Sequence, residues 1–444
     1  MGSKQLLVLT YHYPPDGAVG GMRWAGLTKH LRRLGWETAI VTAAAPDGTG
    51  DMLEEGAVNR LVPYPTLNDA YRSVVSRLRS RSGRRIARTA STAASVMPEA
   101  ARFAMGSLRR EVSALLDFPD PERGWIIPAV AQARAILRLW RAPILVSTGP
   151  PHSVHIAARL ISAEYSIPWF LDFRDPWARV VSDNSPWRPF DQSRLARAVI
   201  PRLERVLIGR ADGVIANTPE LASAFEASYP ASRVHTLRNG VDLEDYSSEP
   251  ARRRPRPVSI CHVGTLYGNR SIAPVLNGIV RFREQHPGVA PQDMILELAG
   301  HIEERQRKVV DETLPASGLQ QSVRLLGKVS REEADRVVGR AGLAVVLAQG
   351  QPLQVPSKLY ECAARGVRTI VIAERDSASA REATRIGVET CPPDDVSTLA
   401  SIVASVWKGD AHTPRVDRAA IDYSRRAAEL DEMLCHAVTA LNPS

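Results

Sequence analysis

Short apolar runs alternate with longer amphipathic segments along most of the chain, which is the pattern of strands that are each followed by a helix. In the first half these runs predict strands at 6–12, 37–43, 144–149, 168–173, 213–217 and 234–238. In the second half they predict strands at 258–263, 295–299, 323–327, 343–348 and 369–373. Strands that alternate with helices pair in parallel, and the helices cover both faces of the sheet. The pattern therefore predicts an α/β fold with two doubly wound sheets.

The alternation is interrupted once, and the interruption divides the chain. With 444 residues, the chain is longer than one hydrophobic core usually supports. The segment 247–257, SSEPARRRPRP, is rich in proline and arginine and predicts a linker. We expect one Rossmann-like domain over 1–246 and a second over 258–414, with a cleft between them. The last segment, 415–444, contains no strand pattern and predicts a long helix that crosses back to the first domain.

The composition is that of a globular protein, since 44% of the residues are hydrophobic and 24% are charged. No apolar run approaches the ~20 residues that span a membrane. The four cysteines lie far apart, and none has the CxxC spacing of a zinc site. We therefore expect reduced thiols, no bound metal and a cytoplasmic location.

The net charge of +9 is concentrated in one segment. Residues 71–110 contain ten arginines and a single acid, Glu99, so the rest of the chain is close to neutral. Apolar residues are interleaved with these arginines, as in a basic amphipathic helix on an anionic membrane surface. A solvated insertion fits the same composition. Nucleic acid is not the expected partner, because aromatic residues for base stacking are few here.

Glycines and a cation follow the first predicted strand, in the segment YHYPPDGAVGGMRWAG. Gly20 and Gly21 allow the backbone to approach a ligand closely, and Arg23 lies near the start of the next helix. Backbone N–H groups at a helix N-terminus favour anions. Glycines in such a turn are often only structural, so this loop alone does not establish a site.

Polar groups also follow the strands at 144–149 and 168–173. Ligands bind at the carboxyl ends of parallel strands. His152, after two prolines, would donate a hydrogen bond to a reacting oxygen, or else only caps its loop. In DFRD, the alternation of an extended chain places Asp172 and Arg174 on one side and Asp175 on the other. One carboxylate would then pair with Arg174 while another faces the cleft; a salt-bridge cluster that holds the loop is the alternative.

The second half carries the sharpest local signal. HVGTLYGNRS (262–271) is a strand followed by a glycine-rich loop and a cation, Arg270, which suits a diphosphate. In VPSKLYECAARG, Pro356 suits a first helical turn, which places Lys358 at the positive end of the helix. Glu361 lies three residues further on nearly the same face. Lys358 would meet a phosphate while Glu361 accepts two ribose hydroxyls; a surface ion pair is the alternative.

These segments together resemble a retaining glycosyltransferase of the GT-B fold, in the large group called family 4. The resemblance covers nearly the whole chain and is carried by YHYPPDGAVGGMRWAGLTKHL, STGPPHS, PWFLDFRDPW, ADGVIANTP, LRNGVD, HVGTLYGNR and VPSKLYECAARG. It implies a hexosyltransferase-type enzyme that transfers a sugar from a nucleotide-sugar donor, keeps the anomeric configuration and needs no metal or cofactor. Polysaccharide, glycolipid or other glycoconjugate biosynthesis is the implied role.

The resemblance also implies roles for individual residues. The implied donor-binding residues are Gly264, Thr265, Arg270, Gln354, Val355, Lys358, Leu359 and Glu361. The implied acceptor-side residues are Gly20, Gly21, Arg23, His152 and Arg174. The implied catalytic residues are His152, Asp175, Arg270 and Lys358.

The chain departs from this family at one position. Many members carry Glu-x7-Glu, and counting back eight from Glu361 gives Leu353, which is not an acid. The transferred hexose would then be held otherwise, for example by the backbone at Gln354 and Val355. The acceptor is not identified; if 71–110 docks on membrane, a lipid-linked acceptor and a peripheral position on the inner face of the membrane are expected. A nucleotide-sugar epimerase and a non-catalytic nucleotide-sugar-binding protein are the alternative functions.

Overall fold

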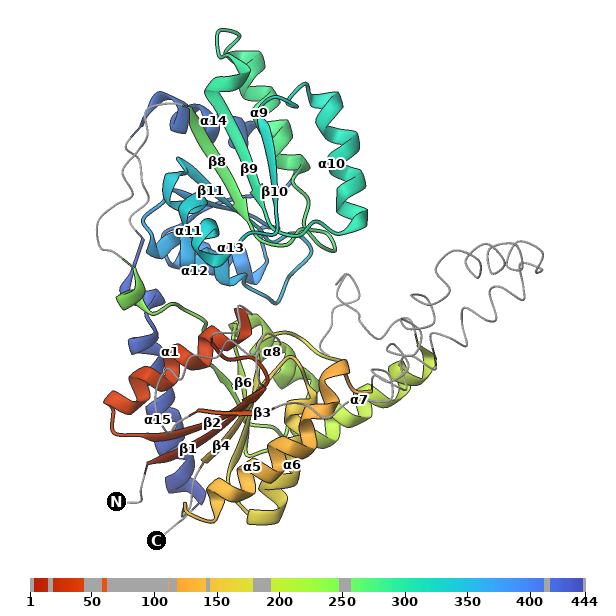
Figure 1. Cartoon of the computed structure of the whole chain (residues 1–444), viewed down its shortest axis with the longest axis vertical. Helices are drawn as coiled ribbons and strands as arrows, with labels where there is room; N and C mark the ends of the chain where they lie inside the picture. The colour runs from red at the N-terminus through yellow and green to blue at the C-terminus, as the bar shows by residue number, and fades with distance from the viewer. Residues whose placement is uncertain are drawn as a thin grey trace, which may run out of the picture.

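The computed structural model describes residues 4–14, 19–43, 58–61, 111, 118–140, 144–178, 193–246, 257–410 and 416–441. The arginine-rich segment predicted at 71–110 lies outside these residues, as does the predicted linker apart from Pro257. The described chain forms two α/β units, one above the other in Figure 1, with the termini at the far end of the lower one. No helix within these residues is long and apolar enough to cross a membrane.

The first unit contains a seven-stranded parallel sheet with the order β3-β2-β1-β4-β5-β6-β7. Its strands are β1 Gln5–Thr10, β2 Glu37–Ala43, β3 Val58–Leu61, β4 Ile144–Gly149, β5 Trp169–Phe173, β6 Gly213–Ala216 and β7 Val234–Thr236. Its helices are α1 Val19–Arg33, α5 Ile126–Leu137, α6 Ser153–Tyr165, α7 Arg194–Ile208 and α8 Pro219–Ser228. The strand order reverses between β1 and β4, so the loops after these two strands diverge and leave room for a ligand.

The second unit contains a six-stranded parallel sheet with the order β10-β9-β8-β11-β12-β13. Its strands are β8 Val258–Val263, β9 Met294–Ala299, β10 Val323–Gly327, β11 Leu343–Leu347, β12 Thr369–Ile372 and β13 Glu389–Cys391. Its helices are α9 Ala273–Gln285, α10 Glu304–Ser317, α11 Arg331–Arg340, α12 Ser357–Ala364, α13 Ala378–Arg385 and α14 Val396–Lys408. Here the order reverses between β8 and β11.

The predicted fold class, α/β with two doubly wound sheets, is confirmed. Two strands were missed, and both are sheet edges. β3 reads VNRL and β13 reads ETC, so neither contains the run of apolar residues that marks a strand buried on both faces. Interior strands such as β1 and β11 are nearly continuous apolar runs, because helices cover both of their faces. The other two edge strands, β7 and β10, are mixed in composition as well, but they were predicted.

The last helix, α15 (Tyr423–Leu441), packs on the first sheet rather than the second. It lies beside α1 in Figure 1, and the two helices share one hydrophobic cluster with β1. The buried side chains that α15 contributes repeat every three or four residues: Tyr423, Ala427, Leu430 and Leu434. The spacing places them on one face of the helix. Lys4 and Asp431, 2.7 Å apart, add an ion pair between the two ends of the described chain.

The two units are joined where the chain crosses between them twice. Val241 N donates to Ile421 O at 2.9 Å, and Tyr423 N donates to Val241 O at 2.9 Å. Gly240 permits this approach, because a Cβ at this position would lie 2.5 Å from the Ile421 carbonyl oxygen. Contacts described below join the carboxyl ends of strands from both sheets, so the two switch points face each other.

Candidate functional site

Beside the switch point of the second sheet, the loops after β8 and β9 are in contact through their backbones. Gly264 follows β8 with φ +157°, and Gly300 follows β9 with φ +143°. A Cβ at Gly300 would lie 2.0 Å from the Gly264 carbonyl oxygen, so the two loops touch backbone to backbone. Only glycine allows this contact. Thr265, the next residue, is half-buried. A ligand can therefore approach the main chain closely here.

Arg270 extends from the loop after β8 and lies over the Tyr267 ring, 4.4 Å from its centroid. It donates to Gln351 Oε1 at 2.7 Å, and its buried Nε has no hydrogen-bond partner. Burial lowers the pKa of Arg270, and the negative charge of Asp175 acts in the opposite direction. Asp175 belongs to the first unit, so its charge acts on this guanidinium across the interface. The free Nε is a donor available to an anion.

Lys358 and Glu361 lie on the first turn and a half of α12, whose N-terminus has no side-chain cap. Lys358 Nζ is 2.6 Å from Glu361 Oε2, and Ser357 Oγ donates to Oε1 at 3.3 Å. Burial raises the pKa of Glu361, but the charges of Lys358, Arg331 and Arg365 outweigh it and lower that pKa overall. The pair is half-buried, with side chains 28% and 17% exposed, so it is not a solvated surface pair.

His262 was not predicted as part of the site, although it underlies both cations. It lies on β8, is buried, and its Nδ1 is 2.9 Å from the Val345 carbonyl oxygen of β11. Burial, together with the nearby charges of Arg270 and Lys358, lowers the pKa of His262 to about 4, although the hydrogen bond to Val345 acts in the opposite direction. Arg270 follows β8 and Lys358 follows β11, and because these two strands pair, both cations lie at the same end of the sheet. A buried histidine next to a cation pair is a signal that only the pairing of β8 with β11 reveals.

The remaining predicted donor residues differ in what they offer. Leu359 is fully buried, and its N–H donates to Pro356 O at 3.0 Å, so neither its side chain nor its N–H is free to bind a donor. Val355 is buried in the core of the second unit. Gln354 donates to Asp175 Oδ1 at 2.5 Å across the interface, and its carbonyl oxygen accepts from Ser379 at 2.7 Å.

At the switch point of the first sheet, Gly20 and Gly21 lie in the first turn of α1, where Gly20 contacts Arg174 and Gly21 contacts the backbone of Tyr13. A Cβ at Gly20 would lie 1.8 Å from Arg174 Nη1, and a Cβ at Gly21 would lie 2.8 Å from Tyr13 Cα. Arg174 donates from Nε to Gly149 O at 3.1 Å and from Nη2 to Pro150 O. Its Nη1 is buried without a hydrogen-bond partner. Burial lowers the pKa of Arg174, and the charges of Asp175 and Asp172 act against that effect.

Two predictions for the first sheet are wrong. The partner of Asp172 is Arg23, not Arg174: Asp172 accepts from Arg23 Nη2 at 3.0 Å and also from Trp24 and Thr148. Arg23 is therefore not a ligand-facing cation; it is 1% exposed and donates to the Leu237 and Arg238 carbonyl oxygens as well. The pair holds α1 to β5 and to the end of β7. The alternation of an extended chain applies to residues of one strand, so it could not identify a partner from another element.

His152 and His155 lie buried together behind the loop after β4. The His152 ring stacks on Trp177 with centroids 4.3 Å apart, and its Nδ1 has no hydrogen-bond partner. His155 Nδ1 is 2.8 Å from Ser147 Oγ. Burial lowers the pKa of His152 well below its usual value and lowers that of His155 to about 3. His152 is therefore neutral at pH 7, which suits a hydrogen-bonding role and excludes a cationic one.

The buried histidines predict an acid-sensitive fold. The unfolded chain takes up protons below about pH 6.5, whereas buried His152, His155 and His262 stay neutral because their folded pKa values are lowered. The contribution of these histidines to the free energy of unfolding is therefore fully present above about pH 6.5. It is lost as the pH falls, by about 1.4 kcal/mol per pH unit for each such histidine. Urea unfolding at a series of pH values measures this slope. His262→Gln is expected to reduce it, with exposed His301→Gln as the control; an unchanged slope in His262→Gln contradicts the assignment.

Leu353 contacts the first unit rather than a ligand. Its side chain packs against the hydrophobic core of the first unit, and its carbonyl oxygen accepts from Thr218 Oγ1 at 2.7 Å. The position where the resembling family has an acid therefore helps to join the two units. Next to it, Asp175 is hydrogen-bonded to Gln354 and lies close to Arg270. Asp175 is thus a first-unit carboxylate that acts on the candidate donor site.

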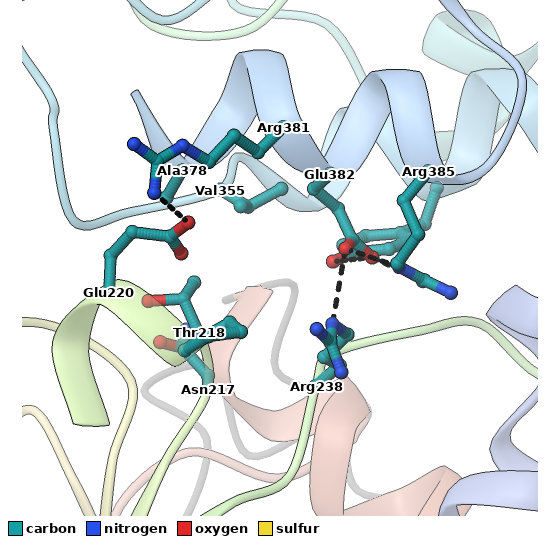
Figure 2. A pocket seen from close by; sticks show the side chains of 11 residues that line it. Asn217, Thr218, Glu220, Arg238, Val355, Ala378, Arg381, Glu382 and Arg385 are labelled. Atoms are coloured by element: carbon teal, nitrogen blue, oxygen red, sulfur yellow. Dashed lines mark hydrogen bonds and ion pairs between the residues drawn. The ribbon is translucent and has the colours of Figure 1, made fainter. Parts of the chain in front are cut away.

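A pocket of about 190 Å³ lies between the units, behind the Asp175–Gln354 contact. Figure 2 shows side chains from both units around it, with Arg381 and Glu220 on one side and Arg238 and Glu382 on the other. This pocket, named the rear pocket below, is separate from the switch point of the second sheet.

Among the described residues, one group of side chains has the spacing of a metal site: His30, Asp242 and Glu244, whose ligand atoms lie within 4.8 Å of one another. Cations of the protein already neutralise it. Lys29 Nζ is 2.5 Å from Asp242 and 2.7 Å from Glu244, and Arg33 also pairs with Glu244. The group lies where α1 meets the crossing between the units, away from both switch points.

Comparison with known proteins supports the same architecture. Residues 94–245 match the family described as Glycosyltransferase Family 4, and no curated protein matches the chain. A sucrose-phosphate synthase from Thermosynechococcus elongatus shares 14% identity at a TM-score of 0.60, covering 98% of this chain and 100% of that chain. Alr3699/HepE of Anabaena, solved in complex with UDP and glucose, shares 13% identity at a TM-score of 0.60, with coverage of 98% and 100%. The α,α-trehalose 6-phosphate synthase of Burkholderia multivorans shares 12% identity at a TM-score of 0.56, with coverage of 100% and 99%.

The fold is that of the GT-B glycosyltransferases. The two Rossmann-like units match these structures over nearly their whole length, whereas the low identities do not extend the likeness to substrates.

Proposed function

We propose that the chain is a hexosyltransferase-type glycosyltransferase that moves a sugar from a nucleotide-sugar donor to an acceptor with retention of the anomeric configuration. The observation that supports this most directly is that Arg270, Lys358 and the uncapped N-terminus of α12 follow the two paired strands at the switch point of a doubly wound sheet. Such switch points bind ligands, and N-terminal N–H groups favour phosphates. Alr3699/HepE, which shares the fold, was solved with UDP and glucose. Polysaccharide, glycolipid or other glycoconjugate biosynthesis is the proposed role.

Donor binding divides the Lys358–Glu361 pair between two parts of the nucleotide. The diphosphate takes the Lys358 ammonium, together with the free Nε of Arg270 and the N–H groups of α12. The ribose hydroxyls then donate to the Glu361 carboxylate, which the neighbouring cations keep ionised. Because the glycines after β8 and β9 carry no side chains, the diphosphate can lie against the main chain of Gly264.

The proposed reaction is a front-face substitution within a closed ion pair. The bond between the anomeric carbon and the diphosphate oxygen breaks, and the acceptor oxygen bonds to the same face of that carbon. The acceptor proton passes to the departing phosphate oxygen. Arg270 and Lys358 stabilise the negative charge that develops on the diphosphate, which is usually the largest catalytic contribution. Asp175 and neutral His152 are proposed to hydrogen-bond the transferred sugar or the acceptor from the first unit.

The acceptor is proposed to approach from the first sheet, where Gly20 and Gly21 lie beside Arg174. A lipid-linked acceptor would follow from contact of residues 71–110 with an anionic membrane. This contact, the cytoplasmic location and the independence from metal stay predictions.

Glu361→Gln separates recognition of the nucleoside from recognition of the diphosphate. Loss of the carboxylate is expected to weaken binding of the matching nucleoside diphosphate by about tenfold or more, because a hydrogen bond to a charged group contributes about 1.5–3 kcal/mol. Inorganic pyrophosphate is expected to bind Glu361→Gln at least as well as the parent. Calorimetry with UDP, GDP, ADP and dTDP first identifies the base and then measures both effects.

Glu304→Gln, at an exposed glutamate of α10, is the matched control. If none of the four nucleotides or their sugar conjugates binds the parent protein, the proposed function fails. Nucleotide binding without sugar transfer to any acceptor would favour a binding protein, and altered sugar stereochemistry with donor alone would favour an epimerase.

A further inference from the structure

The rear pocket is built by both units, and no step of the proposed reaction uses it. Its floor comes from the end of β6 and the start of α8, with Asn217, Thr218 and Glu220. Its roof comes from α13 and the chain before α12, with Ala378 and Arg381 from the former. Figure 2 shows these side chains on opposite sides of one cavity.

The rear pocket is close to the candidate donor site but distinct from it. The Gln354–Asp175 and Thr218–Leu353 hydrogen bonds, 2.5 and 2.7 Å long, join the units at or next to lining residues of the pocket, Thr218 and Val355. Donor-binding residues follow β8 and begin α12, whereas the rear pocket lies at β6 and α13, towards the crossing between the units. Of the predicted donor residues, only Val355 also lines the rear pocket.

Two buried polar atoms of the rear pocket have no hydrogen-bond partner, Asn217 Oδ1 and Arg238 Nε. Asn217 is 6% exposed, and its Oδ1 is buried without a hydrogen bond. Its Nδ2 donates to the Arg174 carbonyl oxygen at 2.7 Å, which fixes the orientation of the amide. A buried amide oxygen without a donor costs about 1–3 kcal/mol of stability. A ligand that brings a hydroxyl group to this oxygen would remove that cost.

The charges around the rear pocket favour an anion. Ion pairs cross it in opposite directions, Arg381 to Glu220 at 3.5 Å and Arg238 to Glu382 at 3.3 Å. Arg385 also pairs with Glu382. Three arginines and two glutamates therefore line the pocket, which leaves one positive charge in excess. Nε of Arg238 is buried, and its contact with Glu382 lacks hydrogen-bond geometry. The Arg381–Glu220 pair is long, so Arg381 can turn to a ligand at little cost.

We propose that the rear pocket binds a small hydroxylated anion, either a sugar phosphate or a sugar acid. A hydroxyl group donates to Asn217 Oδ1, and the anionic group accepts from Arg238 and Arg381. Neutral sugars lack the anion, and inorganic phosphate lacks the positioned hydroxyl.

Occupancy of the rear pocket would also regulate the candidate donor site. Asn217 and Arg238 belong to the first unit, and Arg381 belongs to the second, so the ligand stabilises the arrangement in which both sets meet. A ligand that binds one arrangement better shifts the equilibrium towards it. Nucleotide binding, which needs the facing switch points, then becomes tighter, and by linkage the two affinities rise by the same factor. This coupling rests on the proposed function, whereas binding in the rear pocket does not.

Calorimetry on the full chain with glucose 6-phosphate, glucuronate, glucose and inorganic phosphate tests the proposal. At least one of the two hydroxylated anions is expected to bind about tenfold or more tightly than glucose and phosphate, and the tighter of them identifies the anionic group. Arg381→Gln and Asn217→Leu are each expected to weaken this binding by about tenfold, the loss of one charge-assisted or buried hydrogen bond. Arg281→Gln, an exposed arginine of α9, is the matched control.

The proposal is overturned if neither hydroxylated anion binds, if both variants bind as the parent does, or if the anion competes with nucleotide. Arg381 is 59% exposed, so its variant keeps the test decisive even if Asn217→Leu does not fold, which thermal unfolding will show. Failure here leaves nucleotide binding and its dependence on Glu361 intact, so the two proposals fail separately.

Discussion

Replacing Lys358 with alanine is expected to slow sugar transfer by about 30- to 1,000-fold, which is a loss of about 2–4 kcal/mol of transition-state stabilisation. The ammonium lies at the N-terminal end of α12, where the departing diphosphate would gain negative charge in the proposed reaction. In the free protein it is neutralised by Glu361 at 2.6 Å and becomes available when ribose occupies the carboxylate. The effect should fall mainly on kcat, because the charge develops only as the bond breaks. Steady-state kinetics with the donor identified by calorimetry measures it.

Lys308→Ala is the matched control, since this lysine is 71% exposed on α10 and pairs only loosely with Glu304 at 3.8 Å. Its turnover should equal that of the parent. A Lys358→Ala enzyme with unchanged kcat and kcat/KM would remove Lys358 from the reaction. A change in KM alone would assign it to donor binding without a contribution to the chemical step.

Replacing Asp172 with alanine is expected to lower the free energy of unfolding by about 3–5 kcal/mol, because it leaves Arg23 as an unpaired buried charge. Asp172 accepts from Arg23, Trp24 and Thr148, and both members of the ion pair are buried. Burial raises the pKa of Asp172, but the Arg23 charge and these hydrogen bonds lower it overall, so the carboxylate is ionised. Urea unfolding followed by circular dichroism measures the loss.

Asp311→Ala is the control, because Asp311 is 58% exposed and its ion pair with Arg307 should contribute less than about 1 kcal/mol. Replacing both partners, Arg23→Met with Asp172→Leu, should be less destabilising than Asp172→Ala alone, since no unpaired charge then stays buried. A double variant at least as unstable as Asp172→Ala would show that the pair contributes more than mutual neutralisation.

Helices and strands of this fold were predictable wherever their own residues show the hydrophobic pattern of the element. The eleven predicted strands all coincide with strands of the structure, and the interior ones are mostly apolar because helices cover both of their faces. The edge strands β3 and β13 were missed, because an edge needs fewer apolar residues and depends on its neighbour for pairing. The same local logic placed Arg270, Lys358 and Glu361 after strands, where parallel sheets bind ligands.

Partners from distant parts of the chain were not predictable. Arg23 and Asp172 are 149 residues apart in the sequence, and nothing near either residue shows that the ion pair forms. Leu353 was considered only as a missing acid, whereas it packs against the core of the other unit. His262 was not selected, because its position beneath two cations follows from the pairing of β8 with β11.

The sequence by itself determined the two doubly wound sheets and the polar strand ends, because hydrophobic periodicity and turn residues act over a few neighbouring positions. Only the tertiary structure decided which of those polar groups are available to a ligand and which form ion pairs or hydrogen bonds inside the protein. That decision depends on which strand ends become neighbours and on how two separate sheets meet. The rear pocket belongs wholly to this second level, since its lining residues come from 217–238 and 355–385 and are brought together only by the meeting of the units.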